Sequence, residues 1–318
     1  MVNEGSSREG VGDDIRLAIV GLGDFGRNHL RVCLETAGMT VVAVADTNRE
    51  TARQVAMDHG VAQWFTDPFE LLESVQLDGI VIVTPASSHL PLTREAVDRG
   101  IAVLVEKPIV AGSSDSAEML TLSDRGIVVP GHILRFASPY LELFEKSRGV
   151  EGARIAGLTA RRHRNFDHIA RFPTTDIVLM TMIHDIDQAI WLTGSEGRVV
   201  SARSYSVRGG VNPDLTLATV EDADGRIWDL GASWLLSSGE IPDRLELYSN
   251  VGVDVVSPGE GFDLDDALRE QARHFADCIR HRRRSERITV AEAVHGIAIA
   301  DAIISSARRG GTPVTILL

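Results

Sequence analysis

Three glycines at a fixed spacing form the first pattern in the chain that predicts chemistry. Gly21, Gly23 and Gly26 stand in the run Gly-Leu-Gly-Asp-Phe-Gly, which follows a strand-like stretch and begins a helix-like one. Gly21 permits a tight turn, Gly23 lets the backbone approach a diphosphate, and Gly26 lets helix and strand pack closely. Backbone N–H groups and the helix dipole favour phosphate at such an N-terminus. We therefore expect this loop, with Asp24 and Phe25, to bind a dinucleotide.

An acidic residue at the end of the second expected strand supports that interpretation. Asp46 lies 20 residues after Gly26, where a carboxylate binds ribose hydroxyls. A carboxylate repels a 2′-phosphate, which favours NAD, whereas nearby Arg49 leaves NADP possible because arginine binds phosphate. Two alternatives remain: Asp46 as a helix cap alone, and a methyltransferase, since S-adenosylmethionine sites use a similar glycine turn and acid.

The elements that must position these residues alternate regularly. Apolar runs are separated by helix-like segments, and the runs cover residues 16–20, 40–45, 79–84, 101–105 and 127–129. Strands that are apolar throughout suit a parallel sheet covered on both faces, and alternation with helices is typical of a doubly wound α/β domain. We assign residues 15–130 to a Rossmann dinucleotide-binding domain and residues 1–14 to a disordered tail.

The second half of the chain has a different pattern. Polar and apolar residues alternate around residues 153–161, 199–207, 215–221, 226–235 and 243–249. This alternation predicts a large, open, mostly antiparallel sheet with one uncovered face. Helices are expected at residues 174–192, 264–283 and 290–307. We therefore expect residues 131–318 to form a second α/β domain.

Composition excludes several classes of function. The 318 residues include 45 acidic and 32 basic side chains, and a net charge of −13 disfavours nucleic-acid binding. No uncharged apolar stretch approaches the ~18 residues of a membrane span, and the first 13 residues lack the pattern of a secretion signal. The two cysteines, Cys33 and Cys278, show no metal-ligand spacing, so no metal is expected and cytoplasm is the expected compartment.

Four further motifs follow the glycine loop in order. They are Thr84-Pro-Ala-Ser-Ser-His89, Glu106-Lys-Pro108, Gly131-His-Ile-Leu-Arg-Phe136 and His184-Asp-Ile-Asp187. Together with the loop they resemble the glucose-fructose oxidoreductase / inositol dehydrogenase / rhizopine catabolism (Gfo/Idh/MocA) family over nearly the whole chain. The resemblance implies NAD(P)-dependent oxidation or reduction of a sugar, cyclitol or related polyol. It also implies a homodimer or homotetramer formed through the open sheet of the second domain.

The resemblance assigns roles to single residues. It implies that the nicotinamide end of the cofactor meets Thr84 and Pro85, with His89 close by and Glu106 near the ribose. It places Lys107 at the reacting carbon and His184 across the substrate from it. The chemistry agrees, because burial and a cationic nicotinamide would lower the pKa of a lysine enough for it to act as a base. The structural alternative is a surface lysine after a strand.

His184 poses a specific problem. Dehydrogenases of the family commonly carry an aspartate four residues earlier, and here that position is Met180. A thioether cannot orient an imidazole, so we hypothesise that Thr181 or Asp187 hydrogen-bonds His184. Otherwise His184 binds only a substrate hydroxyl, or is structural. The missing aspartate keeps a second function open, a dinucleotide-binding regulatory or sensor protein without efficient turnover.

Arginines near the expected substrate side suggest what is bound. Arg135, Arg162 and Asp187 are the expected substrate-binding residues. In a strand over residues 160–164, Arg162 and Arg164 share one face. Arginine suits carboxylate or phosphate, so an acidic or phosphorylated sugar is one hypothesis. The alternative is that these arginines pair with acidic residues of the chain.

Overall fold

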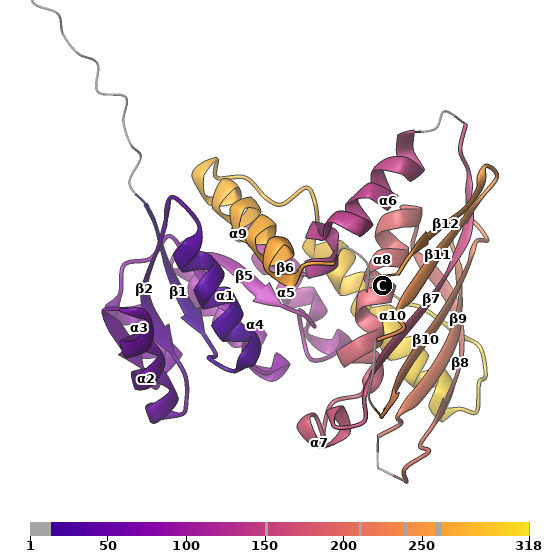
Figure 1. Cartoon of the computed structure of the whole chain (residues 1–318), viewed down its shortest axis with the longest axis horizontal. Helices are drawn as coiled ribbons and strands as arrows, with labels where there is room; N and C mark the ends of the chain where they lie inside the picture. Colours follow the sequence, from indigo (N-terminus) through magenta and orange to yellow (C-terminus); the bar gives the residue numbers. More distant parts are fainter. Residues whose placement is uncertain (1–13, 150–151, 210–211, 238–240, 258–261, 318) are drawn as a thin grey trace, which may run out of the picture.

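The computed structural model describes residues 14–149, 152–209, 212–237, 241–257 and 262–317 (Figure 1). The predicted tail of residues 1–14 therefore lies outside the described residues, apart from Asp14. The described chain forms two sheets with helices packed on them. The change from the first sheet to the second falls after residue 131.

The first sheet is parallel throughout and has the strand order β3-β2-β1-β4-β5-β6. Its strands are β1 (Ile15–Val20), β2 (Met39–Ala45), β3 (Gln63–Phe65), β4 (Gly79–Ile82), β5 (Ala102–Glu106) and β6 (Val128–Gly131). The order reverses between β1 and β4, and ligands of doubly wound sheets bind beyond the carboxyl ends of strands at such a point. The Rossmann prediction is confirmed.

Helices cover both faces of this sheet. They are α1 (Asp24–Glu35), α2 (Arg49–His59), α3 (Pro68–Ser74), α4 (His89–Asp98) and α5 (Ser116–Arg125), with 3₁₀ turns η1 (Ala86–Ser88) and η2 (Ser113–Asp115). Local sequence determines where several of them begin. Asn48 caps α2 by accepting hydrogen bonds from two backbone N–H groups, and Asp67 caps α3 with one. The first residue of α1 has no such cap, so its N-terminal N–H groups remain available.

The second sheet has seven strands in the order β12-β11-β7-β10-β9-β8-β13. They are β7 (Ile155–Asn165), β8 (Gly197–Tyr205), β9 (Leu215–Asp222), β10 (Ile227–Leu236), β11 (Arg244–Ser249), β12 (Gly252–Val256) and β13 (Val314–Thr315). All neighbours are antiparallel except β7 and β10. Buried and exposed residues alternate along β9, as a sheet with one covered face requires.

The helices of this half cover one face of the sheet and also reach the first sheet. They are η3 (Ile133–Phe136), α6 (Ser138–Gly149), α7 (His168–Arg171), the π-helical turn η4 (Val178–Met182), α8 (Ile183–Thr193), α9 (Leu264–Arg280) and α10 (Val290–Arg308). Helix α9 packs on α1, as Figure 1 shows. A side chain at Gly79 would collide there with Ile279 and Phe275. Helix α9, from the second half of the chain, thus helps to cover the first sheet.

Helix α10 is the most apolar helix of the second half. It is the single helix among the described residues that is long and apolar enough to cross a membrane, and 61% of that stretch is buried inside the protein. It contacts α8 and β8 on one side and α5 and β6 on the other. Its position between the two sheets is that of a core helix.

Candidate active site

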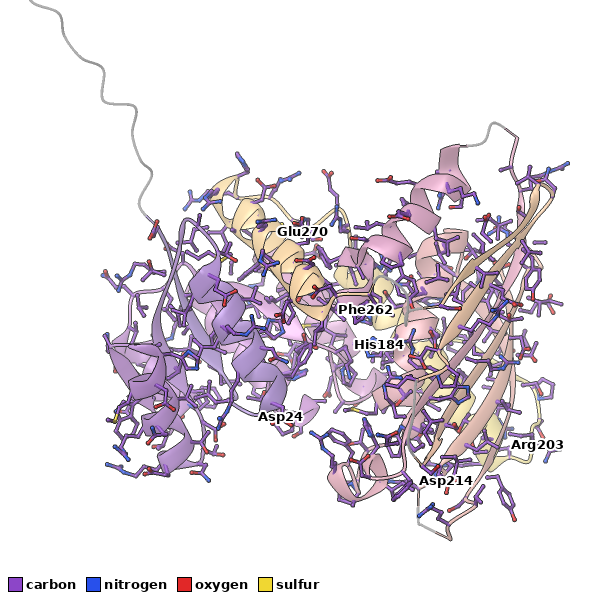
Figure 2. All side chains as sticks on the ribbon, viewed as in Figure 1. Asp24, His184, Arg203, Asp214, Phe262 and Glu270 are labelled. Carbon is purple, nitrogen blue, oxygen red and sulfur yellow. The ribbon has the colours of Figure 1, made fainter. Side chains whose placement is uncertain are left out.

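A cleft of about 2130 Å³ lies between the carboxyl ends of the first sheet and the second sheet's helical face. Gly23, Asp46 and Lys107 line it from the first sheet, and Arg164, Met180 and His184 line it from the other side. In Figure 2, the label of Asp24 marks the glycine-loop side of this cleft and that of His184 the opposite side. The sequence motifs therefore meet in one place.

The glycine loop has the geometry that its sequence predicts. Gly21 has φ of +90°, and a Cβ there would lie 2.5 Å from the Val83 carbonyl oxygen. A Cβ on Gly26 would lie 1.9 Å from the Gly21 oxygen, so helix and loop meet at this point. At Gly23 a Cβ would meet no atom within 4 Å. The loop therefore packs tightly against the protein at Gly21 and Gly26, whereas Gly23 leaves free space toward the cleft.

Asp46 directly follows β2 beside this loop. Its Oδ2 accepts the Leu22 N–H at 2.8 Å, and its Oδ1 accepts the Asn48 N–H at 2.9 Å. These bonds fix the carboxylate at the wall of the cleft. Arg49 stacks on the ring of Trp64, with its guanidinium carbon 5.1 Å from the centroid. This arrangement fits a dinucleotide. It combines Gly23, which leaves space beside the backbone, with the uncapped N-terminus of α1 and the hydrogen-bonded carboxylate of Asp46.

Lys107 follows β5 and reaches into the cleft, next to a cis peptide bond to Pro108. Its Nζ donates to the Met180 carbonyl oxygen at 3.2 Å and lies 3.8 Å from the Met180 sulfur. Burial lowers the pKa of this amine, Glu106 opposes that change, and Arg164 and Arg162 lower the pKa further. The lysine is therefore a cleft residue with an amine that loses its proton more readily than usual, rather than a surface lysine.

Glu106, one residue earlier, is 5% exposed. Its Oε1 lies 3.0 Å from His29 Nε2, and its Oε2 accepts the backbone N–H of Lys107 at 3.1 Å. His29 was not among the residues predicted from the sequence. Its position three residues after Gly26 on the helix that begins at the glycine loop is the one sequence feature that links it to the site.

His184 lines the cleft opposite Lys107, at the beginning of α8. Burial lowers the pKa of His184 well below its usual value, and Lys107 and Arg162 act in the same direction. Its Nδ1 is buried and makes no hydrogen bond within the described part of the chain. The ring is therefore a neutral imidazole at neutral pH.

The two substitutes proposed for the missing aspartate make no hydrogen bond to His184. Thr181 Oγ1 accepts a hydrogen bond from the Trp234 indole at 2.7 Å, and Asp187 pairs with Arg135. The hypothesis that either one orients His184 is wrong. Residues 178–182 form the π-helical turn η4 rather than α-helix, and a π turn changes the direction in which successive side chains point.

His89 and Thr84 connect two loops at the edge of the cleft. His89 is 1% exposed, and its ring nitrogens lie 2.8 Å from the carbonyl oxygens of Thr84 and Pro108. Burial lowers the pKa of His89. Thr84 and Pro85 themselves line the cleft. The structure therefore places His89 behind these residues, where it holds the Thr84 and Pro108 loops together.

Arg135 and Asp187 are buried in the protein and do not line the cleft. Arg135 is fully buried, binds the Asp187 carboxylate through Nε and Nη2 at 2.8–3.1 Å, and also pairs with Glu292 at 3.0 Å. Its guanidinium lies over the Trp191 ring. This placement does not support the expectation that Arg135 and Asp187 bind substrate, and we assign them to packing among η3, α8 and α10.

Arg162 does line the cleft, together with Arg164, so the two share a face of β7 as predicted. Arg162 is nearly fully buried and bonds to Asp185 at 2.7 Å and Asp243 at 3.2 Å. Arg164 shares Asp243 at 2.8 Å. Two arginines and two carboxylates thus compensate one another in the wall of the cleft.

Asp24 and Phe25 lie at the mouth of the cleft. Phe25 lines it and meets the His29 ring edge to face, with 5.1 Å between centroids. Asp24 is exposed and accepts a hydrogen bond of 2.7 Å from Arg171 of α7. In the described part of the chain, no group of three or more His, Cys, Asp or Glu side chains is arranged to hold a metal ion.

Known proteins resemble this chain in sequence. Residues 15–129 match the model of an oxidoreductase family with an NAD-binding Rossmann fold. Inositol 2-dehydrogenase 4 of Saccharopolyspora erythraea is 31% identical over 220 residues, which are 67% of this chain and 64% of that protein. The scyllo-inositol 2-dehydrogenase (NAD(+)) of Bacillus subtilis is 26% identical over 333 residues, 93% of this chain and 95% of that one.

Solved structures share the whole fold. The myo-inositol 2-dehydrogenase of Lactobacillus plantarum superposes with a TM-score of 0.87 at 21% identity, covering 96% of this chain and 100% of that one. The scyllo-inositol dehydrogenase of Lactobacillus casei with bound NAD(H) and scyllo-inositol gives 0.86 at 19% identity, covering 96% and 99%. Residues 15–129 thus belong to the Gfo/Idh/MocA oxidoreductase family with its NAD-binding Rossmann fold, and the solved structures share the fold of nearly the whole chain.

Proposed function

We propose that this chain is an NAD-dependent oxidoreductase that transfers a hydride between nicotinamide and the CH–OH carbon of a cyclitol or related polyol. Family membership and the names of its relatives support this reaction class. The glycine loop and Asp46 would hold the cofactor, with Thr84 and Pro85 at its nicotinamide end. Bound there, NAD supplies the hydride acceptor for alcohol oxidation.

The observation that carries the proposal is the placement of Lys107. Its amine lies in the cleft, its pKa is lowered by burial, and the Met180 carbonyl accepts one of its three N–H donors. A neutral amine can take the proton of a substrate hydroxyl, and the ammonium can return it to a carbonyl in the reverse direction. Lys107 is therefore proposed as the proton donor and acceptor.

His184 is proposed to assist through a different contact. As a neutral imidazole that lines the cleft, it can donate or accept one hydrogen bond with a substrate hydroxyl. Because no carboxylate contacts its ring within the described residues, it has no group with which to share a full positive charge. His184 thus orients the substrate, while Lys107 moves the proton.

The charges of the cleft favour a neutral substrate over an anionic one. Among the described residues, three of the arginines that line the cleft already have acidic partners: Arg162 pairs with Asp185, Arg164 with Asp243, and Arg244 with Glu246. A carboxylate or phosphate on the substrate would have to compete with these partners. An uncharged polyol needs only hydrogen bonds.

Turnover measured with matched lysine variants tests the reaction. We expect NAD⁺ reduction with myo-inositol or scyllo-inositol, followed at 340 nm, and a loss of at least 100-fold in kcat for Lys107→Met. Lys146 is the chain's other lysine and lies exposed beside Asp254, so Lys146→Met is the control. Full activity of Lys107→Met would refute the proposed role of the lysine. Exclusive turnover of a sugar acid would refute the neutral substrate.

A regulatory protein that binds the dinucleotide without turnover is the second candidate. Met180 at the family's aspartate position and the unpartnered Nδ1 of His184 favour it. NADH binding without oxidation of myo-inositol, scyllo-inositol or a sugar acid would select this function. If NADH raises the melting temperature and the protein also turns over one of these substrates, the enzymatic function is supported.

We also propose a cytoplasmic homodimer or homotetramer that joins through the uncovered face of the second sheet. Leu217 and Ile227 are exposed on neighbouring strands there. Light scattering coupled to size exclusion measures the assembly. A monomer at tens of micromolar protein would contradict the proposal. A Leu217→Lys variant that remains oligomeric would contradict the proposed interface, because the oligomer would then form through another surface.

A further inference from the structure

A buried histidine that the proposed mechanism does not use lies directly behind the site. His29 of α1 is 2% exposed, and its Nε2 lies 3.0 Å from Glu106 Oε1. Because a carboxylate oxygen only accepts, the imidazole donates this hydrogen bond. Phe25 packs edge to face on the same ring, so the histidine is held in place by its own helix.

The carboxylate of Glu106 is confined on its other sides as well. Its Oε2 accepts the backbone N–H of Lys107 at 3.1 Å. On β6, a Cβ at Gly131 would lie 2.9 Å from Oε1, so the carboxylate fills the space that this glycine leaves. Both oxygens therefore bind groups other than the side chain of Lys107, although the two residues are neighbours in the chain.

Several groups surround the Lys107 amine. Arg162 and Arg164 face it from β7, His184 from α8, and His132 and His89 lie near it behind the cleft. Among the described residues, the negative charge of Glu106 opposes the effect of burial on the pKa of this amine. An ion pair between the two would keep the lysine protonated. The position of this carboxylate thus decides how readily the lysine gives up its proton.

We propose that His29 is a positioning residue that holds the Glu106 carboxylate against the backbone N–H of Lys107 and so keeps it from pairing with the Lys107 ammonium. The inference rests on the proposed function for its consequence, since it makes Lys107 available as a base. The effect on the lysine itself does not depend on turnover: removing one buried hydrogen-bond donor should change the protonation of a lysine on another element.

The composition of the chain makes that protonation directly measurable. The sequence contains two lysines, Lys107 and Lys146, so protein labelled with ¹³C-lysine shows two Cε signals. We would titrate these signals in the full-length wild type, His29→Leu and His29→Gln. Gln places an amide donor close to the position of Nε2, and Leu fills similar space without a donor. The Lys146 signal is the internal reference and should titrate identically in all three.

In His29→Leu we expect the pKa of Lys107 to rise by about one unit or more, because the freed carboxylate pairs with the ammonium. In His29→Gln it should stay near the wild-type value. In a Glu106→Gln background the His29→Leu change should have no effect, since no carboxylate remains to be released. An unchanged Lys107 titration in folded His29→Leu would overturn the inference. If His29→Leu does not fold, His29→Asn, whose amide is too short to reach Glu106, replaces it.

Kinetics separate this inference from the proposed function. Where wild type turns over, kcat/KM for oxidation should decrease at pH values below the pKa of Lys107, and kcat/KM for reduction should decrease at pH values above it. Both of these pH limits should move to higher pH in His29→Leu. His295, which is also buried, lies in α10 and accepts the Gly197 N–H, so His295→Leu controls for general destabilisation and should leave both limits in place. Absence of turnover in wild type refutes the proposed function alone, because the ¹³C titration still decides the role of His29.

Discussion

Arg171 and Asp24 form an ion pair of 2.7 Å across the mouth of the cleft, from α7 on one side to the first residue of α1 on the other. Asp24 stands at the helix N-terminus where the glycine loop would hold a diphosphate. A free carboxylate there would repel that anion, and the arginine offsets its charge. The second half of the chain thus supplies a charge that the nucleotide site needs.

The first prediction concerns this pair. Arg171→Ala should weaken NADH binding about three- to tenfold at low ionic strength, because Asp24 is then uncompensated. Asp24→Ala should tighten binding, and the double variant should return close to wild type. The differences should shrink in 0.5 M KCl. Fluorescence titration of NADH measures each dissociation constant. Arg53→Ala, at an exposed pair with Glu50 on α2, is the control, and an equal loss there would contradict the prediction.

The second prediction separates two glycines of the loop. Gly23→Ala should fold with unchanged or slightly raised stability, because φ is −65° and a Cβ meets no protein atom. It should nevertheless weaken NADH at least tenfold, since the methyl group occupies the diphosphate's space. Gly26→Ala should instead lower the melting temperature, because its Cβ would overlap the Gly21 oxygen. Melting curves with and without NADH distinguish the two. Gly149→Ala, also open around its Cβ, should neither lower the stability nor weaken NADH binding.

The third prediction concerns the choice between NAD and NADP. Asp46→Asn keeps an oxygen to accept the Leu22 N–H and removes the negative charge. We expect NADH to bind about tenfold more weakly, from the loss of charged hydrogen bonds to the ribose, and NADPH to bind better. Adding Arg49→Ala should cancel the gain for NADPH, because Arg49 on Trp64 is the nearby cation. Asp58→Asn, exposed on α2, is the control. An unchanged preference in Asp46→Asn would contradict the assignment.

The fourth prediction is a loss of stability in mild acid. Burial lowers the pKa values of His184 and His132, so below about pH 6.5 the unfolded chain binds protons that the folded protein does not. The free energy of unfolding should therefore fall as pH drops from 7 to 5, by up to about 1.4 kcal/mol per pH unit for each such histidine. The raised pKa of Asp185 acts in the opposite sense, because its folded form takes up a proton as pH falls.

Urea unfolding of the cofactor-free protein at pH 7.5, 6.5 and 5.5 measures this dependence. His184→Asn removes one of the titrating groups and should flatten the slope. His59→Asn, exposed at the end of α2, should leave the slope as it is. A slope in His184→Asn equal to that of wild type would show that His184 binds its proton equally in both states.

Features that depend on neighbouring residues were predictable from the sequence. The glycine loop, Asp46 and Lys107 follow directly from a strand and a turn, and strand ends of a parallel sheet converge. Partners from distant elements were not predictable. Arg135 and Asp187 carry the charges of a binding site, yet packing with α10 places them together in the interior.

The failure at His184 has a local physical cause. Spacing by four along an assumed α-helix relates Met180 to His184, and three-residue spacing relates His184 to Thr181 and Asp187. The π turn at residues 178–182 changes that relation, and Trp234 binds Thr181. His29 could not be assigned either, because its partner Glu106 is 77 positions away.

The packing of α9 on α1 also bears on the order in which the protein can be built. During synthesis the nucleotide-binding half emerges first, but Phe275 and Ile279, which cover the beginning of β4 beside Gly79, follow only near the end. Until then that apolar surface faces water or a chaperone. A chain that stops before residue 264 would keep every glycine and acid of the nucleotide site and still lack part of the core that supports it. The packing therefore predicts that the core of the first sheet is completed only after most of the chain has been synthesised.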